Sequence, residues 1–301
     1  MGYLNGGQWR IESVIPTRDQ RYVRSPTTFR HKITADGSSG YLAESGRYHL
    51  YVSPSCPWAH RVLLALRLQG LEESISMSMA DPLVGEQGWT FPQNSLDDLY
   101  LWQVYTRAVP NYTGRATVPV LWDKKRQTIV NNESREILRM LDREFISLAR
   151  SPRSYCPSEK EYLIDQRIDE IHLVNNGVYR VGFAATQAAR EEALKELFTA
   201  LDRWEAFLSV QRFLCGDEIT EADWCLFVTL IRFDCAYYGA FGCNLRRLTE
   251  YPHLQSYLWE LYAVAGVAET CNFLAICRHY YLSYPSRLQN QEMFSKITQE
   301  R

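Results

Sequence analysis

The spacing of apolar residues changes near position 150 of this 301-residue chain. Before that point, short apolar runs typical of β-strands alternate with stretches of helical spacing. After it, apolar residues recur almost throughout at intervals of three and four, as in amphipathic helices. Residues 149–157, which are rich in Arg, Ser and Pro, separate the two parts. We therefore expect two domains, the first mixed α/β and the second all-helical.

The first part predicts a small mixed sheet over residues 46–148. Residues 48–52 have strand composition, and residues 58–68 repeat apolar side chains at helical spacing up to Gly70. Further strands are expected at residues 75–79, 118–122 and 128–130, and a second helix at residues 133–141. This order of elements is typical of helices packed on a mixed sheet.

Pro119 conflicts with the strand expected at residues 118–122. Proline removes a hydrogen-bond donor from the ladder and normally occurs at strand ends, edges or special turns. A cis peptide bond between Val118 and Pro119 would resolve the conflict.

Two stretches of the first part lie outside this sheet. Residues 1–45 have weak periodicity, and we expect them to form an extended arm over a domain surface. Residues 81–116 form a long insertion, and their aromatic side chains favour an ordered structure over a disordered one.

The second part, residues 158–301, predicts helices packed around one buried helix. A capping box, Ser158-x-x-Glu161, is expected to open the first helix. Another capping box, Thr220-x-x-Asp223, precedes residues 225–231, which are apolar on all sides. A helix that is apolar all round is buried, so this one should lie at the centre of the all-α domain.

The composition excludes several classes of partner. The 33 basic and 35 acidic residues give a net charge of −2, so no global positive field attracts nucleic acid or anionic lipid. No apolar stretch approaches the ~18 residues that span a bilayer, and the first residues lack the apolar run of a secretory signal. We expect a cytoplasmic protein with no nucleic-acid or membrane partner.

One of the eight cysteines stands out. The chain has no C-x-x-C pair, so we expect no metal site, and in a reducing compartment most thiols should be small buried side chains. Cys56, however, lies between the first strand and the first helix, with Pro57 in the first helical turn. The helix N-terminus, with His60 and Arg61 one turn along, should stabilise a thiolate and lower the pKa of Cys56.

Ala59 stands where a dithiol motif would have its second cysteine. Cys56 therefore needs an external thiol to resolve a mixed disulfide, and glutathione is the expected co-substrate. The middle of glutathione would pair with the backbone of Val118. Its γ-glutamyl carboxylate would bind Ser134 and helix N–H groups, and its ammonium would bind Glu133. Taken alone, Glu133-Ser134 is equally typical of an ordinary first helical turn.

Five sequence motifs carry a resemblance to a known family. They are Ser53–Arg61, Gly114–Asp123, Asn131–Ser134, Asn175–Tyr179 and Arg232–Asp234. From about residue 29 to residue 281 the chain resembles the glutathionyl-hydroquinone reductases, the Xi class of glutathione transferases. The resemblance implies a glutathione transferase fold, with an α/β thioredoxin-like N-terminal domain and an all-α C-terminal domain, in a homodimer. It also implies that glutathionylated hydroquinones are reduced with release of glutathione disulfide.

The resemblance assigns roles to individual residues. Cys56 would be the nucleophile, and Tyr179 and Tyr280 would take part in catalysis. The residues expected to bind glutathione or the acceptor are Trp89, Arg115, Val118, Pro119, Glu133, Ser134, Tyr237 and Tyr281. Tyrosines suit a quinol pocket, since the ring offers a flat apolar face and the phenol can hydrogen-bond an oxygen. His60 and His172 are expected to be structural.

The chain departs from the family pattern near the presumed acceptor pocket. Ala240 and Gly242 stand where the family usually has His and Lys around Phe241. Two further departures, Ser283-Tyr284-Pro285 and Leu288-Gln289-Asn290, follow the last helix. These changes bear on the choice of acceptor more than on the thiol chemistry.

Two other functions would use the same fold. One is general deglutathionylation or dehydroascorbate reduction through the same cysteine, as in omega-like transferases. The other is a non-catalytic glutathione-fold binding module, in which Cys56 needs no activation. The many tyrosines in the helical part favour an aromatic acceptor.

Overall fold

The computed structural model describes residues 2–12, 17–92 and 99–284, and they form two compact units. The N-terminal unit comprises Met1–Val14, Pro26–Ser154 and Glu269–Asn272. The helical unit comprises Ile15–Ser25, Tyr155–Ala268 and Phe273–Arg301.

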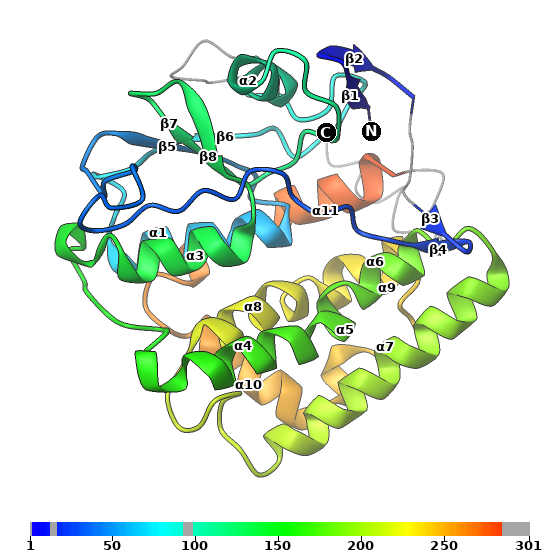
Figure 1. Ribbon diagram of the computed structural model, residues 1–301. Helices are drawn as coiled ribbons and strands as arrows, with labels where there is room; N and C mark the ends of the chain where they lie inside the picture. Colours follow the sequence, from blue (N-terminus) through cyan, green and yellow to red (C-terminus); the bar gives the residue numbers. More distant parts are fainter. Residues whose placement is uncertain (1, 13–16, 93–98, 285–301) are drawn as a thin grey trace. The chain divides into compact units, whose positions relative to one another are not determined.

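A four-stranded mixed sheet forms the centre of the N-terminal unit. Its strand order is β6 (Ser76–Met79), β5 (Tyr48–Val52), β7 (Val120–Asp123) and β8 (Thr128–Asn131). β6 runs parallel to β5, while β7 is antiparallel to both of its neighbours. The helices α1 (Pro57–Gln69) and α3 (Ser134–Arg143) pack against each other on one side of this sheet, and α2 (Leu101–Ala108) lies on the other (Figure 1).

The register of the central strands sets the position of the candidate thiol. Tyr51 of β5 pairs with Val120 of β7, and Tyr48 pairs with Asp123. Because the two strands are antiparallel, the end of β5 and the start of β7 lie at the same edge of the sheet. The loops that carry Cys56 and Val118 both extend from that edge. The peptide bond between Val118 and Pro119 is cis, as predicted, and β7 begins only at Val120, since proline cannot donate to the ladder.

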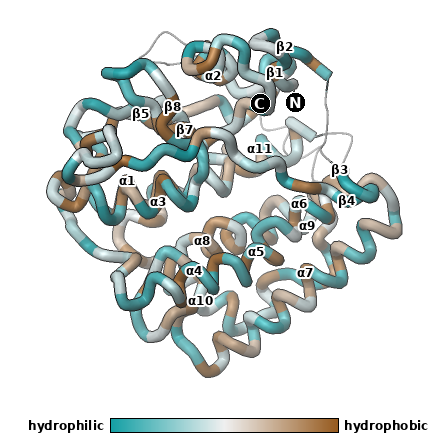
Figure 2. Tube along the Cα trace, in the orientation of Figure 1, coloured by the Kyte–Doolittle hydropathy of each residue, from teal (hydrophilic) through white to brown (hydrophobic). Residues whose placement is uncertain are grey.

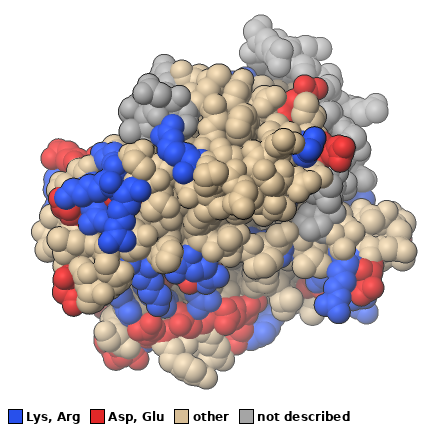
Figure 3. All heavy atoms as spheres, turned by 45° about the horizontal axis from the view of Figure 1, so that its top comes forward, with Lys and Arg blue, Asp and Glu red and all other residues tan. Residues whose placement is uncertain are grey.

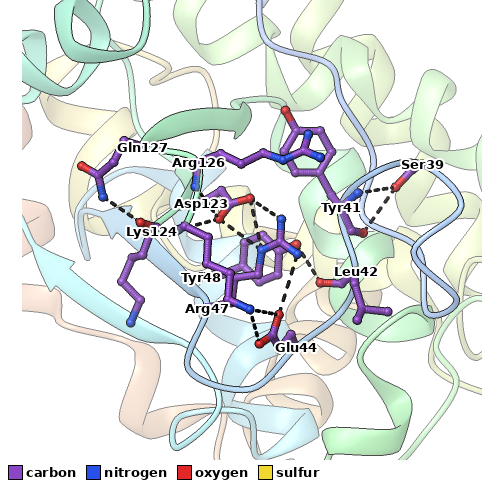
Figure 4. A network of polar contacts seen from close by, with 11 residues as sticks. Ser39, Tyr41, Leu42, Glu44, Arg47, Tyr48, Asp123, Lys124, Arg126 and Gln127 are labelled. Atoms are coloured by element: carbon purple, nitrogen blue, oxygen red, sulfur yellow. Dashed lines mark hydrogen bonds and ion pairs between the residues drawn. The ribbon is translucent and has the colours of Figure 1, made fainter.

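A buried ion pair fixes the opposite end of the same two strands (Figure 4). The Arg47 guanidinium donates to both carboxylate oxygens of Asp123, at 2.6 and 3.2 Å. Asp123 also accepts the backbone N–H groups of Lys125 and Arg126, which closes the turn between β7 and β8. Glu44 extends the network outward to Arg47 and Lys125.

Part of the expected arm forms short strands instead of a purely extended chain. The strands β1 (Tyr3–Asn5) and β2 (Gln8–Arg10) form a hairpin, and β3 (Thr17–Arg18) and β4 (Arg21–Tyr22) form another. In the N-terminal unit, Leu4 exchanges two backbone hydrogen bonds with Gly114, at 2.8 and 2.9 Å. The β1–β2 hairpin therefore holds the end of the 81–116 insertion.

The insertion contains a helix that the sequence reasoning did not predict. α2 is amphipathic, with Leu101, Val104 and Tyr105 buried at intervals of three and four. Eight residues give only two turns, which is too short a window for periodicity to stand out. The described part of the insertion is ordered, and residues 93–98 lie outside the described residues.

The helical unit contains helices of very unequal length. They are α4 (Glu161–Glu170), α5 (His172–Asn175), α6 (Gly177–Gly182), α7 (Gln187–Leu208), α8 (Glu221–Leu230), the π-helical turn η3 (Phe233–Tyr237), α9 (Tyr238–Ala240), α10 (Pro252–Tyr262) and α11 (Phe273–Leu282). Its single 3₁₀ turns are η2 (Ser158–Lys160) and η4 (Leu248–Glu250), while η1 (Ile146–Leu148) belongs to the N-terminal unit and η5 (Ala268–Thr270) begins at the last residue of a helical-unit segment. Within the described residues, no helix is long and apolar enough to cross a membrane.

Every residue of α8 is buried, as its all-round apolar sequence predicted. The tube coloured by hydropathy is brown over much of this helix and over parts of the central strands (Figure 2). The capping box at its start is confirmed, because Asp223 accepts from both the backbone N–H and the hydroxyl of Thr220. The capping box predicted at Ser158 is wrong: Ser158 begins the 3₁₀ turn η2, and α4 starts after it at Glu161.

Candidate active site

Cys56 is the N-cap residue of α1, and Pro57 occupies the first turn. Its backbone N–H bonds to the Ser53 carbonyl at 3.3 Å, and its carbonyl accepts the His60 N–H at 2.9 Å. The Sγ atom lies 3.8 Å from the carbonyl oxygen of Val118. The sequence-predicted nucleophile and the cis-proline loop are therefore side by side, and the thiol lies at the positive end of a helix.

The turn before Cys56 is polar but buried. Ser53 and Ser55 are fully buried, and their hydroxyl groups hydrogen-bond each other at 2.8 Å. His60 is also buried, and its Nε2 hydrogen-bonds the Thr270 hydroxyl at 2.8 Å. Arg61 stacks on the Trp58 ring, 4.5 Å from its centroid. The contact with Thr270 fits the structural role expected for His60.

Glu133 is the N-cap residue of α3, and Ser134 is the first residue of that helix. The Glu133 carboxylate accepts the Arg135 N–H at 3.5 Å and the Thr27 hydroxyl at 3.1 Å. Asn131 holds the backbone of Glu133 in turn, because its Oδ1 accepts the Glu133 N–H at 2.7 Å. The geometry places one carboxylate and one hydroxyl at a helix N-terminus, where a bound carboxylate would also meet backbone N–H groups.

Tyr105 of α2 links the two loops that the sequence assigned to glutathione. Its hydroxyl donates to the Thr117 carbonyl at 2.8 Å and accepts from the Thr117 N–H and from Asn132 Nδ2, at 3.2 and 3.0 Å. Thr117 precedes Val118, and Asn132 precedes Glu133. Burial raises the pKa of Tyr105 to about 12, so its hydroxyl stays protonated. Tyr105 was missed because one tyrosine in a long insertion gives no sequence signal.

The remaining residues predicted for the thiol site come from the insertion. Trp89 is buried, and its carbonyl accepts the Leu101 N–H at the start of α2. Arg115 follows Gly114, which the β1–β2 hairpin holds through Leu4. Both residues therefore lie on ordered backbone.

The helical unit brings together three of the four predicted tyrosines by their hydroxyl groups. Tyr280 of α11 lies 2.8 Å from Tyr179 of α6 and 3.1 Å from Tyr237 of η3, oxygen to oxygen. Tyr237 and Tyr280 are fully buried, and Tyr179 is partly exposed. Burial first, and then the neighbouring Tyr237, raise the pKa of Tyr280 well above its ordinary value.

The fourth tyrosine, Tyr281, is placed differently. It is fully buried, and its hydroxyl occupies the space that a side chain at position 239 would need. A Cβ added to Gly239 would lie 2.1 Å from that oxygen. The glycine therefore makes room for Tyr281, and the contact is one of close packing.

The chain is similar in sequence and in fold to known glutathione transferases. Residues 55–144 match the model of the glutathione S-transferase N-terminal domain, and residues 187–258 match that of the C-terminal domain. The glutathionyl-hydroquinone reductase PcpF of Sphingobium chlorophenolicum is 46% identical, over 95% of this chain and 93% of that protein. A Xi-class transferase structure from Natrialba magadii has a TM-score of 0.90 at 43% identity, covering 97% of this chain and 92% of its own.

The chain belongs to the Xi class of glutathione transferases. Its fold is the glutathione transferase fold, an α/β thioredoxin-like domain followed by an all-α domain, as the sequence predicted. The glutathionyl-hydroquinone reductase YqjG of Escherichia coli is a further relative, 44% identical over 94% of this chain and 92% of that protein. Its glutathione-bound structure has a TM-score of 0.87 at 41% identity, covering 95% of this chain and 92% of that one.

In this Xi-class transferase, aromatic residues that the sequence did not single out surround Tyr179. Tyr22 of β4 and Phe183 contact its ring, and Phe241 lies 5.5 Å from it, between the departures Ala240 and Gly242. Tyr284 packs on Phe183 and Phe241, so this departure from the family pattern joins the cluster. The departures at 285 and 288–290 lie outside the described residues. Spacing could not have found Tyr22, because it lies in the irregular arm.

Basic and acidic side chains are interspersed on the surface of the described residues (Figure 3). On the face shown in Figure 3, Lys and Arg lie next to Asp and Glu around a broad uncharged area. Among the residues that the structure describes, no three His, Cys, Asp or Glu side chains are grouped as metal ligands.

Proposed function

We propose that this transferase reduces glutathionyl-hydroquinones to hydroquinones with glutathione as the reductant, through Cys56 alone. The observation that carries the proposal is the place of Cys56 at the start of α1, with Sγ 3.8 Å from the Val118 carbonyl. The names of two relatives, PcpF and YqjG, give the same activity. Both are at least 44% identical to this chain over most of its length.

The reaction needs two steps, the attack of a thiolate on a thioether sulfur and then a thiol–disulfide exchange. The Cys56 thiolate attacks the sulfur of the glutathionyl-hydroquinone, and the bond between that sulfur and the aromatic carbon breaks. The carbon takes a proton and leaves as the hydroquinone, while Cys56 keeps glutathione as a mixed disulfide. A second glutathione thiolate attacks this disulfide, which releases glutathione disulfide and restores the Cys56 thiolate. The N-terminus of α1 lowers the free energy of the Cys56 thiolate, which attacks in the first step and leaves in the second.

We propose that the cis-proline loop and the start of α3 bind glutathione. The Val118 backbone pairs with the cysteinyl part of the tripeptide beside Pro119. Glu133 binds the γ-glutamyl ammonium, and Ser134 with the first N–H groups of α3 binds its carboxylate. Trp89 and Arg115 contact the tripeptide from the insertion. The support is the ordered position of each residue and the glutathione-bound structure of the E. coli relative.

We propose that the tyrosine cluster serves the acceptor. Because the pKa of Tyr280 is raised, its phenol stays protonated and can donate a hydrogen bond to a quinol oxygen. Tyr179 and Tyr237 hold that hydroxyl in place. Tyr281 shapes the same region by its packing on Gly239.

Substrate comparison tests the proposed function. Turnover of glutathionyl-menadione should exceed that of dehydroascorbate by at least tenfold in kcat/KM. Equal or reversed rates would favour the omega-like reductase instead. A pH profile of Cys56 alkylation by iodoacetamide tests the scaffold alternative, since a midpoint at the free-cysteine value of ~8.5 would show an unactivated thiol.

Replacing Tyr280 by Phe should lower kcat for glutathionyl-menadione by about tenfold or more, because a positioned hydrogen-bond donor to the acceptor is lost. The rate of Cys56 alkylation should stay unchanged, since the substitution leaves the thiol site intact. Tyr162→Phe is the matched control, because Tyr162 is 84% exposed. Unchanged kcat in Tyr280→Phe would exclude the phenol from the reaction.

Replacing Tyr105 by Phe should raise KM for glutathione and lower the free energy of unfolding by about 1–3 kcal/mol. The reason is that the Thr117 N–H and the Asn132 amide lose their buried acceptor. Urea unfolding and initial rates at varied glutathione measure the two effects. Tyr3→Phe, at a partly exposed position, should change neither. An unchanged KM in Tyr105→Phe would contradict the link between α2 and the glutathione loops.

The homodimeric state, the cytoplasmic location and the domain boundaries drawn from the sequence remain predictions.

A further inference from the structure

Two cysteines of the helical unit face each other across neighbouring elements. Cys235 lies in η3 and Cys277 in α11, which packs on η3. The Cys277 thiol donates to the Cys235 carbonyl oxygen at 3.7 Å, and the Cys235 thiol donates to the Ile231 carbonyl oxygen at 3.6 Å. Both side chains are partly exposed, whereas Cys243 in the same unit is buried.

The environment makes the two thiols unequal. The neighbouring Cys235 thiol lowers the pKa of Cys277 below its ordinary value. The same interaction raises the pKa of Cys235. One thiol of the pair is therefore suited to attack as a thiolate, and the other holds the proton.

We infer that Cys235 and Cys277 are a thiol–disulfide modification site that glutathione disulfide oxidises reversibly. The inference goes beyond the proposed reaction, because Cys56 takes no part in it. A low-molecular-weight disulfide is the required oxidant, and the proposed reaction releases one.

The chemistry balances in two exchanges. The Cys277 thiolate attacks one sulfur of glutathione disulfide, the sulfur–sulfur bond breaks, and one glutathione leaves as a thiolate. Cys235 then loses its proton and attacks the Cys277 sulfur of the mixed disulfide, and the second glutathione leaves. The two cysteines lose two electrons and two protons, and glutathione disulfide becomes two glutathione molecules. Excess glutathione reverses both exchanges.

The cross-link would join two of the three elements that carry the hydroxyl-bonded tyrosines. Tyr237 is two residues beyond Cys235, and Tyr280 is three residues beyond Cys277. A bond between the cysteines would close a loop whose ends are 42 residues apart in sequence and would fix α11 on η3. The oxidised form should therefore unfold about 5 °C or more above the reduced form.

Peptide mapping of the full chain tests the site. The protein is incubated with glutathione disulfide, free thiols are blocked under denaturing conditions, and trypsin separates residues 233–246 from residues 248–278. The expected product is a peptide pair joined by a disulfide, lighter by two hydrogen atoms, that disappears after incubation with excess glutathione. The joined pair should be lost in Cys277→Ser and in Cys235→Ser.

Each peptide contains a second cysteine, which provides the controls. Cys243→Ser and Cys271→Ser should keep the cross-link, because those residues lie outside the facing pair. Absence of the joined peptides in the unmodified protein would overturn the inference, and so would a lasting glutathione adduct on Cys277. The mapping reads a mass and requires no turnover, so its result is independent of the proposed function.

Discussion

Turnover of glutathionyl-menadione should fall by roughly 10⁴-fold or more when Cys56 is replaced by Ser. The substitution exchanges one atom at the N-cap of α1, where serine is itself a favourable residue, so the fold should survive. What is lost is the thiolate, because a serine hydroxyl is not ionised near neutral pH and forms no mixed disulfide with glutathione. Initial rates with glutathione in excess measure the effect.

The mass of the protein tests the same mechanism through the intermediate that Cys56 should form. After incubation with glutathionyl-hydroquinone alone, Cys56 in the unmodified protein should carry one glutathione, which marks the first half of the reaction. Cys271→Ser is the matched control, since it makes the same atomic change in the N-terminal unit at a partly exposed thiol. Turnover retained in Cys56→Ser would end the single-cysteine mechanism.

Replacing Arg47 by Met should lower the free energy of unfolding by about 3–5 kcal/mol, because Asp123 is left as an unpaired buried carboxylate. Urea unfolding at neutral pH measures the loss. Lys125→Met is the control, because Lys125 is 58% exposed and its ion pair with Glu44 should contribute about 1 kcal/mol or less. A small effect of Arg47→Met would mean that water or another cation replaces the guanidinium.

Because of the same ion pair, we expect part of the free energy of unfolding to be lost at acidic pH. Burial opposes ionisation of Asp123, but the Arg47 guanidinium and two backbone N–H groups outweigh it, so the pKa of Asp123 lies below its ordinary value. A carboxylate with a lowered pKa stabilises the fold fully above the unfolded-state value of about 3.9. That contribution is lost as the pH falls below about 4 and through the folded-state pKa. In Asp123→Asn this part of the pH dependence should vanish.

The elements that the sequence predicted are those with long or strongly patterned signals. Residues 48–52 form β5 at the predicted bounds, and α8 is buried because its sequence is apolar on every side. The conflict at Pro119 led to the correct cis bond, since only a few backbone conformations accommodate a proline there. α2 was missed because its pattern spans only two turns and depends on partners distant in sequence.

The residues of the candidate site also divide into those that local sequence predicts and those that only tertiary contacts place. Cys56 and Val118 could be paired in advance because a strand, a helix N-terminus and a proline each limit the backbone locally. Tyr105, Thr27 and Tyr22 could not, since each reaches its partner through tertiary contacts across a long stretch of chain. The error at Ser158 has a local cause. The chain enters α4 through a 3₁₀ turn, and the spacing of a capping box does not distinguish a 3₁₀ turn from the first turn of an α-helix.

The pairing of the arm also sets an order for folding during synthesis. Leu4 bonds to Gly114, and Phe29 bonds to Asn132, 103 residues later in the chain. Leu4 and Phe29 are therefore made long before their partners leave the ribosome, and the closure of so long a loop is slow. The segments around Leu4 and Phe29 are then among the last parts of the N-terminal unit to pack. A nascent chain stalled before residue 114 should leave both segments open to proteases, and one stalled well beyond residue 132 should protect them.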